Sequence, residues 1–470
     1  MNRSTFIKKS AVLSTGLLLS KLPTFGNPAL PVVRVAPDQR KFSSKVIEDT
    51  ILEFQSAVKD KELGWLFGNC FPNTLDTTVT YTKGSKPDTY VITGDIDAMW
   101  LRDSTAQVWP YLNFIKKDKD LQHLIAGVIN RQTACILRDP YANAFYDDPT
   151  KTGEWKTDET DMKPGLHERK WEIDSLCYPI RLAHRYWQLT GDTTPFDAQW
   201  KQAIGLTLKT FKEQQRKQNN GPYHFQRKTS WATDGVPMNG YGYPVKPVGL
   251  ICSSFRPSDD ATVYSFLVPS NFFAVTSLRQ AAKMIDKIAS DKATVNELNA
   301  LALEVETALK RHAIINHSDY GKIYAYEVNG YGSYNLMDDA NVPSLLALPY
   351  LDAMPVNDPV YQTTRKMLLS LNNPFFFKGK AGEGIGGPHA GIDMIWPLGI
   401  IIRGLTSTSE KEIRECITLL KNCHAGTGFM HESFHKNDAA NFTRKWFAWA
   451  NTLFGEFLWE TYKSKPHLLS

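Results

Sequence analysis

Apolar residues recur at spacings of three and four along most of the chain from about residue 44 onward, and Gly-, Pro- and Asp-rich segments interrupt them. This spacing puts the apolar side chains on one face of an α-helix. Several of the runs begin with Ser, Asp or Asn, which cap helix N-termini. The pattern predicts helices at residues 44–60, 104–117, 121–139, 174–191, 195–217, 271–290, 293–313, 342–351, 359–370, 392–405, 409–424 and 445–464.

Alternating patterns typical of strands are few, at residues 77–82, 88–93 and 322–328. No Pro- or Ser-rich linker and no change in composition divides the chain after the N-terminus. We therefore predict a single all-α domain over residues 44–470, an (α/α)6 barrel with small β insertions, in which the loops at one set of helix ends surround a central cleft. An α-solenoid is the competing architecture, but the chain shows no repeat of the length such folds require.

The first residues are typical of an export signal. Arg3, Lys8 and Lys9 precede the short apolar run "AVLSTGLLLS", and "RSTFIK" resembles a twin-arginine signal with its second arginine replaced by serine. We predict that residues 1–26 are removed on export from a bacterial cytoplasm, that 27–43 form an N-terminal extension, and that the protein is periplasmic or secreted. A retained N-terminal helix is the alternative.

Composition and charge exclude several classes of function. A net charge of +5 spread over 470 residues is too dilute for a nucleic-acid-binding surface, and no apolar stretch is long enough to span a membrane. The six cysteines form no C-x-x-C pair and are predicted to be buried free thiols. The 12 Trp, 19 Tyr and 24 Phe indicate either a large aromatic core or a cleft lined by rings, which suits sugars.

The segment "GDIDAMWLRDS" (94–104) combines the groups that carbohydrate recognition requires. A carboxylate accepts two hydroxyl hydrogen bonds, a guanidinium donates as a fork, and an indole stacks on the face of a pyranose. We therefore predict that this segment binds substrate through Asp97, Trp100, Arg102 and Asp103. Metal sites need a different grouping, two or three His, Asp or Glu at close spacing. The segments "DDAN" and "SDDA" could hold calcium, but neither resembles a twelve-residue calcium loop, so we predict no metal.

Two further segments contain candidate catalytic carboxylates. Asp259 and Asp260, in "FRPSDDATVYSFLVPSN", either cap the helix expected after them or place one carboxyl in the cleft as a general acid, with Arg256 close enough to bind substrate. Glu432, in "GFMHESFHKND", is either a solvated surface residue or a general base held near two histidines.

Two further segments are rich in glycine or in charge. His389 and Asp393 follow four glycines, which allow backbone to approach a ligand closely; a turn with a helix-capping Asp is the compatible alternative. The acids Glu168, Glu172 and Asp174 of "HERKWEID" are interpreted as an ordinary charged helix start rather than a cleft edge.

Motifs for serine hydrolases, zincins and nucleotide-dependent enzymes are absent from the sequence. Paired carboxylates remain, and these are the groups that glycoside hydrolysis uses.

Four long motifs, "TGDIDAMWLRDSTAQVWPYL", "FRPSDDATVYSFLVPSN", "HAGIDMIWPLGIIIRG" and "GFMHESFHKNDAANFTRKWFAWANTLFGEFL", together resemble glycoside hydrolase family 125. The family comprises bacterial exo-α-1,6-mannosidases with an (α/α)6 barrel, and the resemblance covers residues 44–463. It implies inversion without a metal or other cofactor, with Asp259 as general acid (Asp260 as the alternate) and Glu432 as general base.

The implied substrate is a mannose-containing oligosaccharide, such as an N-glycan or mannan fragment, and no obligate protein partner is predicted. An (α/α)6 α-glycosidase of other specificity and a non-catalytic cell-surface glycan-binding protein are the alternatives.

Overall fold

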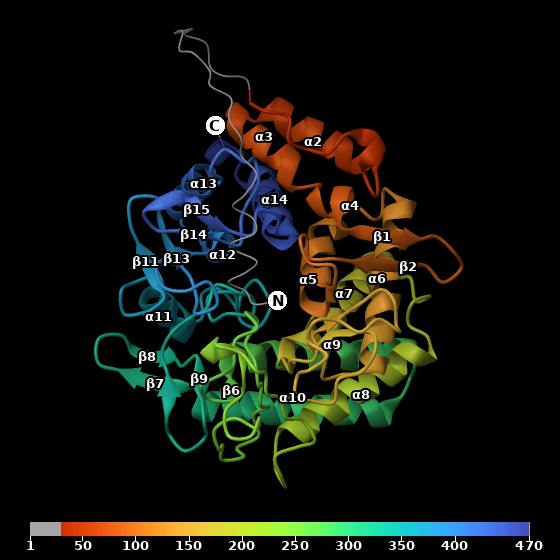
Figure 1. The fold of residues 1–470 in the computed structure, drawn as a ribbon, viewed down its shortest axis with the longest axis vertical. Coiled ribbons are helices and arrows are strands. Elements are labelled where there is room, and N and C mark those ends of the chain that lie inside the picture. The colour runs from red at the N-terminus through yellow and green to blue at the C-terminus, as the bar shows by residue number, and fades with distance from the viewer. Residues whose placement is uncertain (1–29, 470) are drawn as a thin grey trace.

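Helices alternate between an inner and an outer ring along the chain (Figure 1). The structure, a computed structural model, describes residues 30–469, and the predicted signal peptide at residues 1–26 lies outside this range. The inner ring contains α5 (Leu101–Val108), α7 (Ile173–Thr190), α9 (Val268–Ile288), α12 (Pro397–Leu405) and α14 (Ala448–Ser464). The outer ring contains α6 (Lys119–Arg138), α8 (Ala198–Gln214), α10 (Lys292–His312), α11 (Pro359–Leu368) and α13 (Glu410–Cys423). The predicted all-α (α/α)6 barrel is confirmed.

Burial distinguishes the two rings. Every residue of α5 is buried, as are most residues of α12 and α14. The outer helix α10 instead buries one apolar stripe and exposes its other faces, as expected for an amphipathic helix. That stripe consists of Leu298, Leu301, Ala302, Val305, Ala308 and Leu309. Polar residues on α5, including Arg102 and Asp103, are therefore inside the barrel.

The sixth inner position is formed by turns, so the helix predicted at residues 342–351 is wrong. The amides of Leu345 and Leu346 donate to the side chain of Asp338 rather than to carbonyls one turn earlier. Two prolines in the segment lack an amide hydrogen, which further disfavours a helix. Tyr178 of α7 donates to the backbone of this segment at 2.9 Å, which fixes it in the inner ring.

Two helices near the N-terminus complete the outer ring. Helices α2 (Lys45–Ala57) and α3 (Lys61–Cys70) pack on each other, and α3 packs on α13 and α14. The sequence pattern predicted α2 but not α3, because Gly64 and Gly68 lower its helix propensity. The short α4 (Asn73–Thr77) was also missed.

Short strands mostly tie neighbouring loops together. The predicted strands at 77–82 and 88–93 are confirmed as the hairpin of β1 (Val79–Thr82) and β2 (Asp88–Val91), and residues 322–328 contain two strands rather than one. Three-stranded sheets are formed by β3 (Met99–Trp100), β4 (Ala144–Phe145) and β5 (Leu166–Glu168), by β6 (Phe266–Leu267), β9 (Glu327–Val328) and β10 (Tyr334–Asn335), and by β13 (Met394–Ile395), β14 (Ser433–His435) and β15 (Asp438–Thr443). Two further hairpins pair β7 (Ile314–His317) with β8 (Gly321–Tyr324) and β11 (Phe376–Lys378) with β12 (Glu383–Ile385).

The chain before α2 is attached to the barrel by ion pairs. Of the predicted extension at 27–43, the structure describes residues 30–43. Arg34 donates to Asp76 at 2.7 Å and to Glu48 at 2.9 Å, so it joins this segment to α4 and α2.

The six cysteines are buried and free, as predicted. Burial raises the pKa of Cys135 to about 12, which keeps such a thiol neutral and poorly nucleophilic. Within residues 30–469, none of the helices is both long and apolar enough to cross a membrane.

Candidate active site

Six loops meet at one end of the barrel, because each of them leads from an outer element into an inner one. They span residues 94–100, 167–172, 253–267, 336–341, 383–396 and 428–447. Since the inner helices all start at this end, which we call the loop end, their unpaired N-terminal amides face it. The sheet of β3, β4 and β5 joins the first two loops. Polar residues from distant parts of the chain are thereby collected at the loop end.

Arg102, in the first turn of α5, is the centre of a buried ionic cluster. Its Nη1 donates to Glu172 at 2.6 Å and to Asp174 at 3.2 Å, and its Nη2 donates to Asp259 at 3.3 Å. Its Nε lies 3.5 Å from the carboxylate of Asp103. Burial alone would lower the pKa of Arg102, but the negative charges of these acids raise it well above its ordinary value. Arg102, predicted to bind substrate, thus holds the acids of the site in place.

Glu172 and Asp174 are fully buried, which corrects their interpretation as an ordinary charged helix start. Glu172 immediately precedes α7 and Asp174 lies in its first turn. Burial raises the pKa of Asp174 to about 6. Burial, together with the negative charge of Asp259, raises the pKa of Glu172 well above its ordinary range. These acids therefore belong to the site, and Glu172 favours its protonated form.

Asp259 is the most exposed of the three acids that accept hydrogen bonds from Arg102. Its side chain is 20% exposed, whereas Glu172 and Asp174 are fully buried. Its φ of 66° is a left-handed conformation that Asp tolerates better than most residues. Asn143 donates to the same carboxylate oxygen as Arg102, at 3.3 Å. The helix-capping alternative is wrong, since α9 begins at Val268.

Asp260 points into the protein and is held by hydroxyl groups. Thr233 donates to its Oδ1 at 2.7 Å, and Ser258 donates to its Oδ2 at 3.2 Å. The Nδ1 of His389 lies 3.7 Å from Asp260 Oδ1. Burial alone would raise the pKa of Asp260, but a hydrogen bond and the charge of His389 lower it. These contacts fix the turn that presents Asp259; a direct contact between Asp260 and substrate stays a prediction.

A second buried cluster supports the backbone of Asp259. Lys170 donates to the Asp259 carbonyl at 2.8 Å and to Asp234 at 2.6 Å. Arg227 donates to Glu168 at 2.9 Å. Sequence reasoning missed Lys170, Arg227 and Asp234, because helical periodicity does not show which loops meet. The cluster fixes the direction in which the Asp259 side chain points.

Glu432 is a second carboxylate of the loop end. Its side chain is 9% exposed, so the surface alternative is wrong. Thr443 donates to its Oε2 at 2.9 Å, and Arg444 donates to its Oε1 at 3.5 Å. The neighbouring His431 instead stacks on Phe442 at a centroid separation of 3.6 Å. A hydroxyl and a guanidinium therefore orient Glu432 where histidines had been predicted, and Arg444 was missed from the sequence.

Arg444 and Gly94 connect the Glu432 loop to the 94–100 loop. Arg444 Nε donates to Asp95 at 2.9 Å. Gly94, with a φ of 129°, pairs with Phe447, and a β-carbon there would lie 2.5 Å from the carbonyl oxygen of Trp446. Only glycine permits this approach.

Asp103 lies within electrostatic reach of Asp259 and of two arginines. Burial raises its pKa to about 6, Asp259 adds to the shift, and the positive charges of Arg102 and Arg444 oppose it. One of these arginines, Arg444, also contacts Glu432. This position suits its predicted role as a substrate ligand.

Comparison with known proteins identifies the family of the chain. A family model described as metal-independent α-mannosidase (GH125) matches residues 60–459. The chain belongs to glycoside hydrolase family 125. The resemblance predicted from its motifs is thereby confirmed, and the protein is a metal-independent α-mannosidase.

Two relatives match this family 125 protein over most of its length. A metal-independent α-mannosidase from Streptococcus pneumoniae, solved in a non-productive complex with α-1,6-mannobiose, is 40% identical; the match covers 90% of this chain and 100% of that one, with a TM-score of 0.87. The Meiotically up-regulated gene 157 protein of Schizosaccharomyces pombe is 40% identical over 469 residues, which are 95% of this chain and 91% of its own. A glucoamylase from Saccharomycopsis fibuligera, at 12% identity and a TM-score of 0.53 over 92% and 99% of the two chains, shares the fold alone.

Buried cations lie among the acids of this α-mannosidase. Arg102 contacts four carboxylates, and Lys170 contacts those of Glu168 and Asp234. Over residues 30–469, no group of three or more His, Cys, Asp or Glu residues is placed to hold a metal ion.

The remaining predicted ligands fall into two sets. Trp100 is buried beside His167, with ring centroids 5.0 Å apart, and His389 lies beside Asp260, so both are at the loop end. Arg256 is buried and donates to Glu327 at 2.7 Å, which anchors the loop that presents Asp259. Its role as a substrate ligand stays a prediction.

Asp97 and Asp393 lie apart from the ionic cluster. The side chain of Asp97 is 76% exposed and pairs with Lys151 at 3.1 Å. Asp393 pairs with Lys436 at 2.7 Å. The structure does not bring either residue into contact with Arg102 or Glu432, and their binding roles stay predictions.

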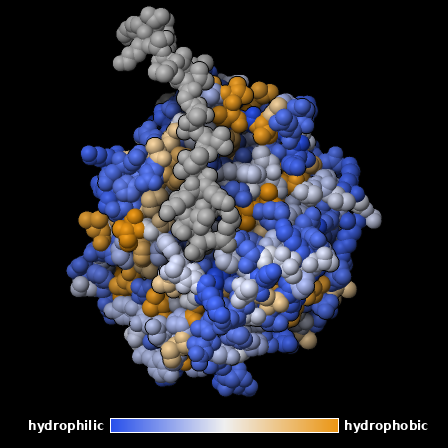
Figure 2. All heavy atoms as spheres, viewed as in Figure 1, coloured by the Kyte–Doolittle hydropathy of each residue, from blue (hydrophilic) through white to orange (hydrophobic). Residues whose placement is uncertain are grey.

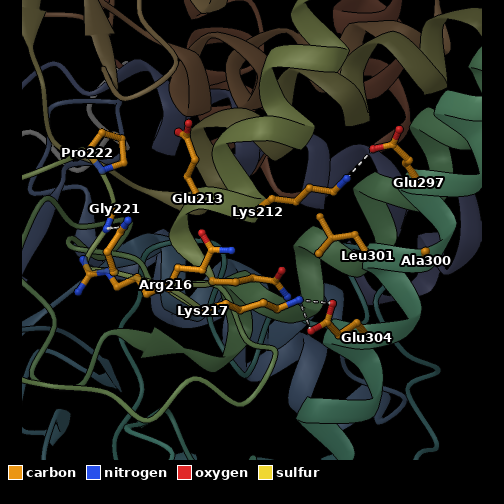
Figure 3. Close-up of a pocket in the computed structure, with 13 residues that line it drawn as sticks. Lys212, Glu213, Arg216, Lys217, Gly221, Pro222, Glu297, Ala300, Leu301 and Glu304 are labelled. Carbon is orange, nitrogen blue, oxygen red and sulfur yellow. Dashed lines mark hydrogen bonds and ion pairs between the residues drawn. The ribbon is translucent and has the colours of Figure 1, made fainter.

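A crevice of about 760 Å³ lies elsewhere, between α8 and α10 (Figure 3). Its charges already pair across it, Lys212 with Glu297 at 2.5 Å and Lys217 with Glu304 at 2.7 Å. None of the predicted site residues lines it. On the face seen down the barrel, apolar side chains form small separate patches among larger hydrophilic areas (Figure 2). We therefore assign the active site to the loop end.

Proposed function

We propose that this α-mannosidase releases the non-reducing terminal mannose from α-1,6-linked mannosides with inversion, with Asp259 as general acid and Glu432 as general base. The observation that carries this proposal is the contrast between the two carboxylates at the loop end. Asp259 belongs to a cluster of acids around one guanidinium, whereas Glu432 is held by a guanidinium and a hydroxyl. Different surroundings are what two carboxyls with opposite roles require.

The choice of Asp259 over Asp260 as the acid rests on exposure and hydrogen bonding. Asp259 is partly exposed, while Asp260 is buried and accepts hydrogen bonds from two side-chain hydroxyls. An acid must reach the glycosidic oxygen, and only the exposed carboxyl is free to do so.

Glu432 suits the role of base. Thr443 and Arg444 hold its two oxygens in place, and a carboxylate can take a proton from water. In an inverting reaction that water attacks C1 opposite the leaving group, so the C1–oxygen bond breaks as the new one forms. The proton from water goes to Glu432, and the proton from the acid side goes to the leaving oxygen.

The α-1,6 linkage is inferred from the S. pneumoniae relative, whose structure contains α-1,6-mannobiose. A carboxylate and an indole at the loop end (Asp103 and Trp100) match the hydroxyls and apolar face of a terminal mannose. N-glycan fragments and mannan are the natural glycans that present this linkage.

A panel of α-linked disaccharides tests the specificity. We expect α-1,6-mannobiose to give the highest kcat/KM, above α-1,2- and α-1,3-mannobiose and above α-linked glucose disaccharides, with mannose as the released sugar. A higher kcat/KM for a glucoside would show an α-glycosidase of other specificity. Binding without release of any monosaccharide would show a glycan-binding protein and overturn the proposal.

A further inference from the structure

Too many buried acids surround Arg102 for all of them to be ionised. Four carboxylates, those of Asp103, Glu172, Asp174 and Asp259, lie within 3.5 Å of this one guanidinium. Uncompensated buried charge is strongly unfavourable, so such a group of acids retains at least one proton. The question is which carboxyl holds that proton and what the proton does.

The hydrogen bonds of Glu172 point to this residue. Its Oε2 accepts from Arg102 at 2.6 Å and from Ser175 at 2.9 Å. Its Oε1 is buried, and no donor among residues 30–469 bonds it. The Glu172 carboxyl also faces the carboxyl of Asp259, and two carboxyls can share a hydrogen bond only if one of them carries a proton. A proton on Glu172 satisfies both observations.

The other charged groups around Glu172 agree with this placement. It is faced by Arg102 on α5, Asp174 on α7, Asp259 in the 253–267 loop and Tyr223 in the segment after α8. Burial, with the negative charge of Asp259, raises the pKa of Glu172. Burial alone would raise the pKa of Asp259, but the positive charges of Arg102 and Lys170 lower it. In the resting site the proton therefore lies on the Glu172 side of the pair.

We propose that Glu172 is a positioning residue that holds a proton against Asp259 and passes it on as Asp259 protonates the glycosidic oxygen. This inference rests on the proposed role of Asp259 as the general acid. Glu172 is fully buried, so it acts through Asp259 and does not itself touch the substrate.

The proton transfers balance. As the C1–oxygen bond breaks, the proton held by Glu172 moves to Asp259, and Asp259 passes it to the departing oxygen, which leaves Glu172 ionised. Glu432 takes a proton from the attacking water, whose oxygen bonds to C1. After the products leave, Glu432 releases its proton to solvent and solvent returns one to Glu172.

The test compares a leaving group that needs a proton with one that does not. In the Glu172→Gln variant we expect kcat for α-1,6-mannobiose to fall by about 100-fold or more, a magnitude typical of lost general-acid assistance. The kcat for α-mannosyl fluoride should fall far less, because fluoride leaves without being protonated. The alkaline limb of the mannobiose pH profile should also move to lower pH, since Gln cannot hold the transferable proton.

Asp174→Asn is the matched control. Asp174 is equally buried and pairs with the same guanidinium, at 3.2 Å, but it does not hold the transferable proton, so its substitution should change the rates for both substrates by the same factor. A Glu172→Asp variant keeps a carboxyl and should recover part of the mannobiose rate that the Gln variant loses. Circular dichroism checks that each variant is folded.

Two results would overturn the inference. One is near wild-type mannobiose turnover with an unchanged alkaline limb in Glu172→Gln. The other is an equal loss on both substrates, which would make Glu172 purely structural. An Asp259→Asn variant that kept mannobiose turnover would instead refute the proposed acid, so the two failures are distinguishable.

Discussion

Substitution of Asp259 by Asn is expected to lower kcat for α-1,6-mannobiose by about three orders of magnitude, as loss of a general acid does. Asn keeps the size of the side chain and can still contact Arg102 and Asn143, so the loop should stay folded and the mannoside should still bind. The departing oxygen, however, would leave without a proton. Turnover of α-mannosyl fluoride should be retained to a much larger extent.

Steady-state kinetics on both substrates, with binding measured by calorimetry, check this prediction. Glu304→Gln is the control, since Glu304 pairs with Lys217 in the crevice between α8 and α10 and should leave all rates at the wild-type level. If Asp259→Asn retained near wild-type mannobiose turnover while Asp260→Asn lost it, Asp260 would be the acid.

Glu432→Gln is expected to reduce turnover of mannobiose and of α-mannosyl fluoride alike, by about 10²- to 10⁴-fold. Both reactions need a base to take a proton from the attacking water, so a better leaving group does not restore the rate. The amide can still accept from Thr443 and keeps the side-chain volume, which favours a folded variant.

Azide provides a direct check on this role. In a Glu432→Ala variant, azide can enter the vacated space and attack C1 without a base, and the expected product is β-mannosyl azide. If the Gln variant lost mannobiose activity but kept fluoride activity, Glu432 would act on the leaving-group side and its assignment as base would be wrong.

Periodicity predicted most of the barrel because each inner and outer helix carries an apolar face of the right spacing. The periodicity gave a wrong prediction where a side chain, rather than a backbone carbonyl, accepts the amide hydrogen bonds. Residues 342–351 are apolar enough for a helix, yet the amides of Leu345 and Leu346 donate to the side chain of Asp338, and two prolines interrupt the segment. It also failed at α3, where glycines weaken the local signal although packing on α14 stabilises the helix.

The candidate site was predictable where function shows in local composition. Asp259, Glu432 and the 94–104 segment stand out because they combine acids with Arg or aromatic residues. Glu172 and Lys170 did not, since a charged stretch before a helix is ordinarily solvated. Their burial follows from the meeting of six loops at the N-terminal ends of inner helices, which is a property of the closed ring. Arg102 was predicted as a substrate ligand, but its contacts make it the residue that holds the acids together.

The stereochemistry of hydrolysis tests the central proposal most directly. Proton NMR of α-1,6-mannobiose with a large amount of enzyme can follow the anomeric signals within the first minutes, before mutarotation. With Asp259 as acid and Glu432 as the base that activates water on the opposite face, β-mannose should form first and α-mannose should grow in later. Initial release of α-mannose would contradict inversion and require one of the two carboxylates to act as a nucleophile.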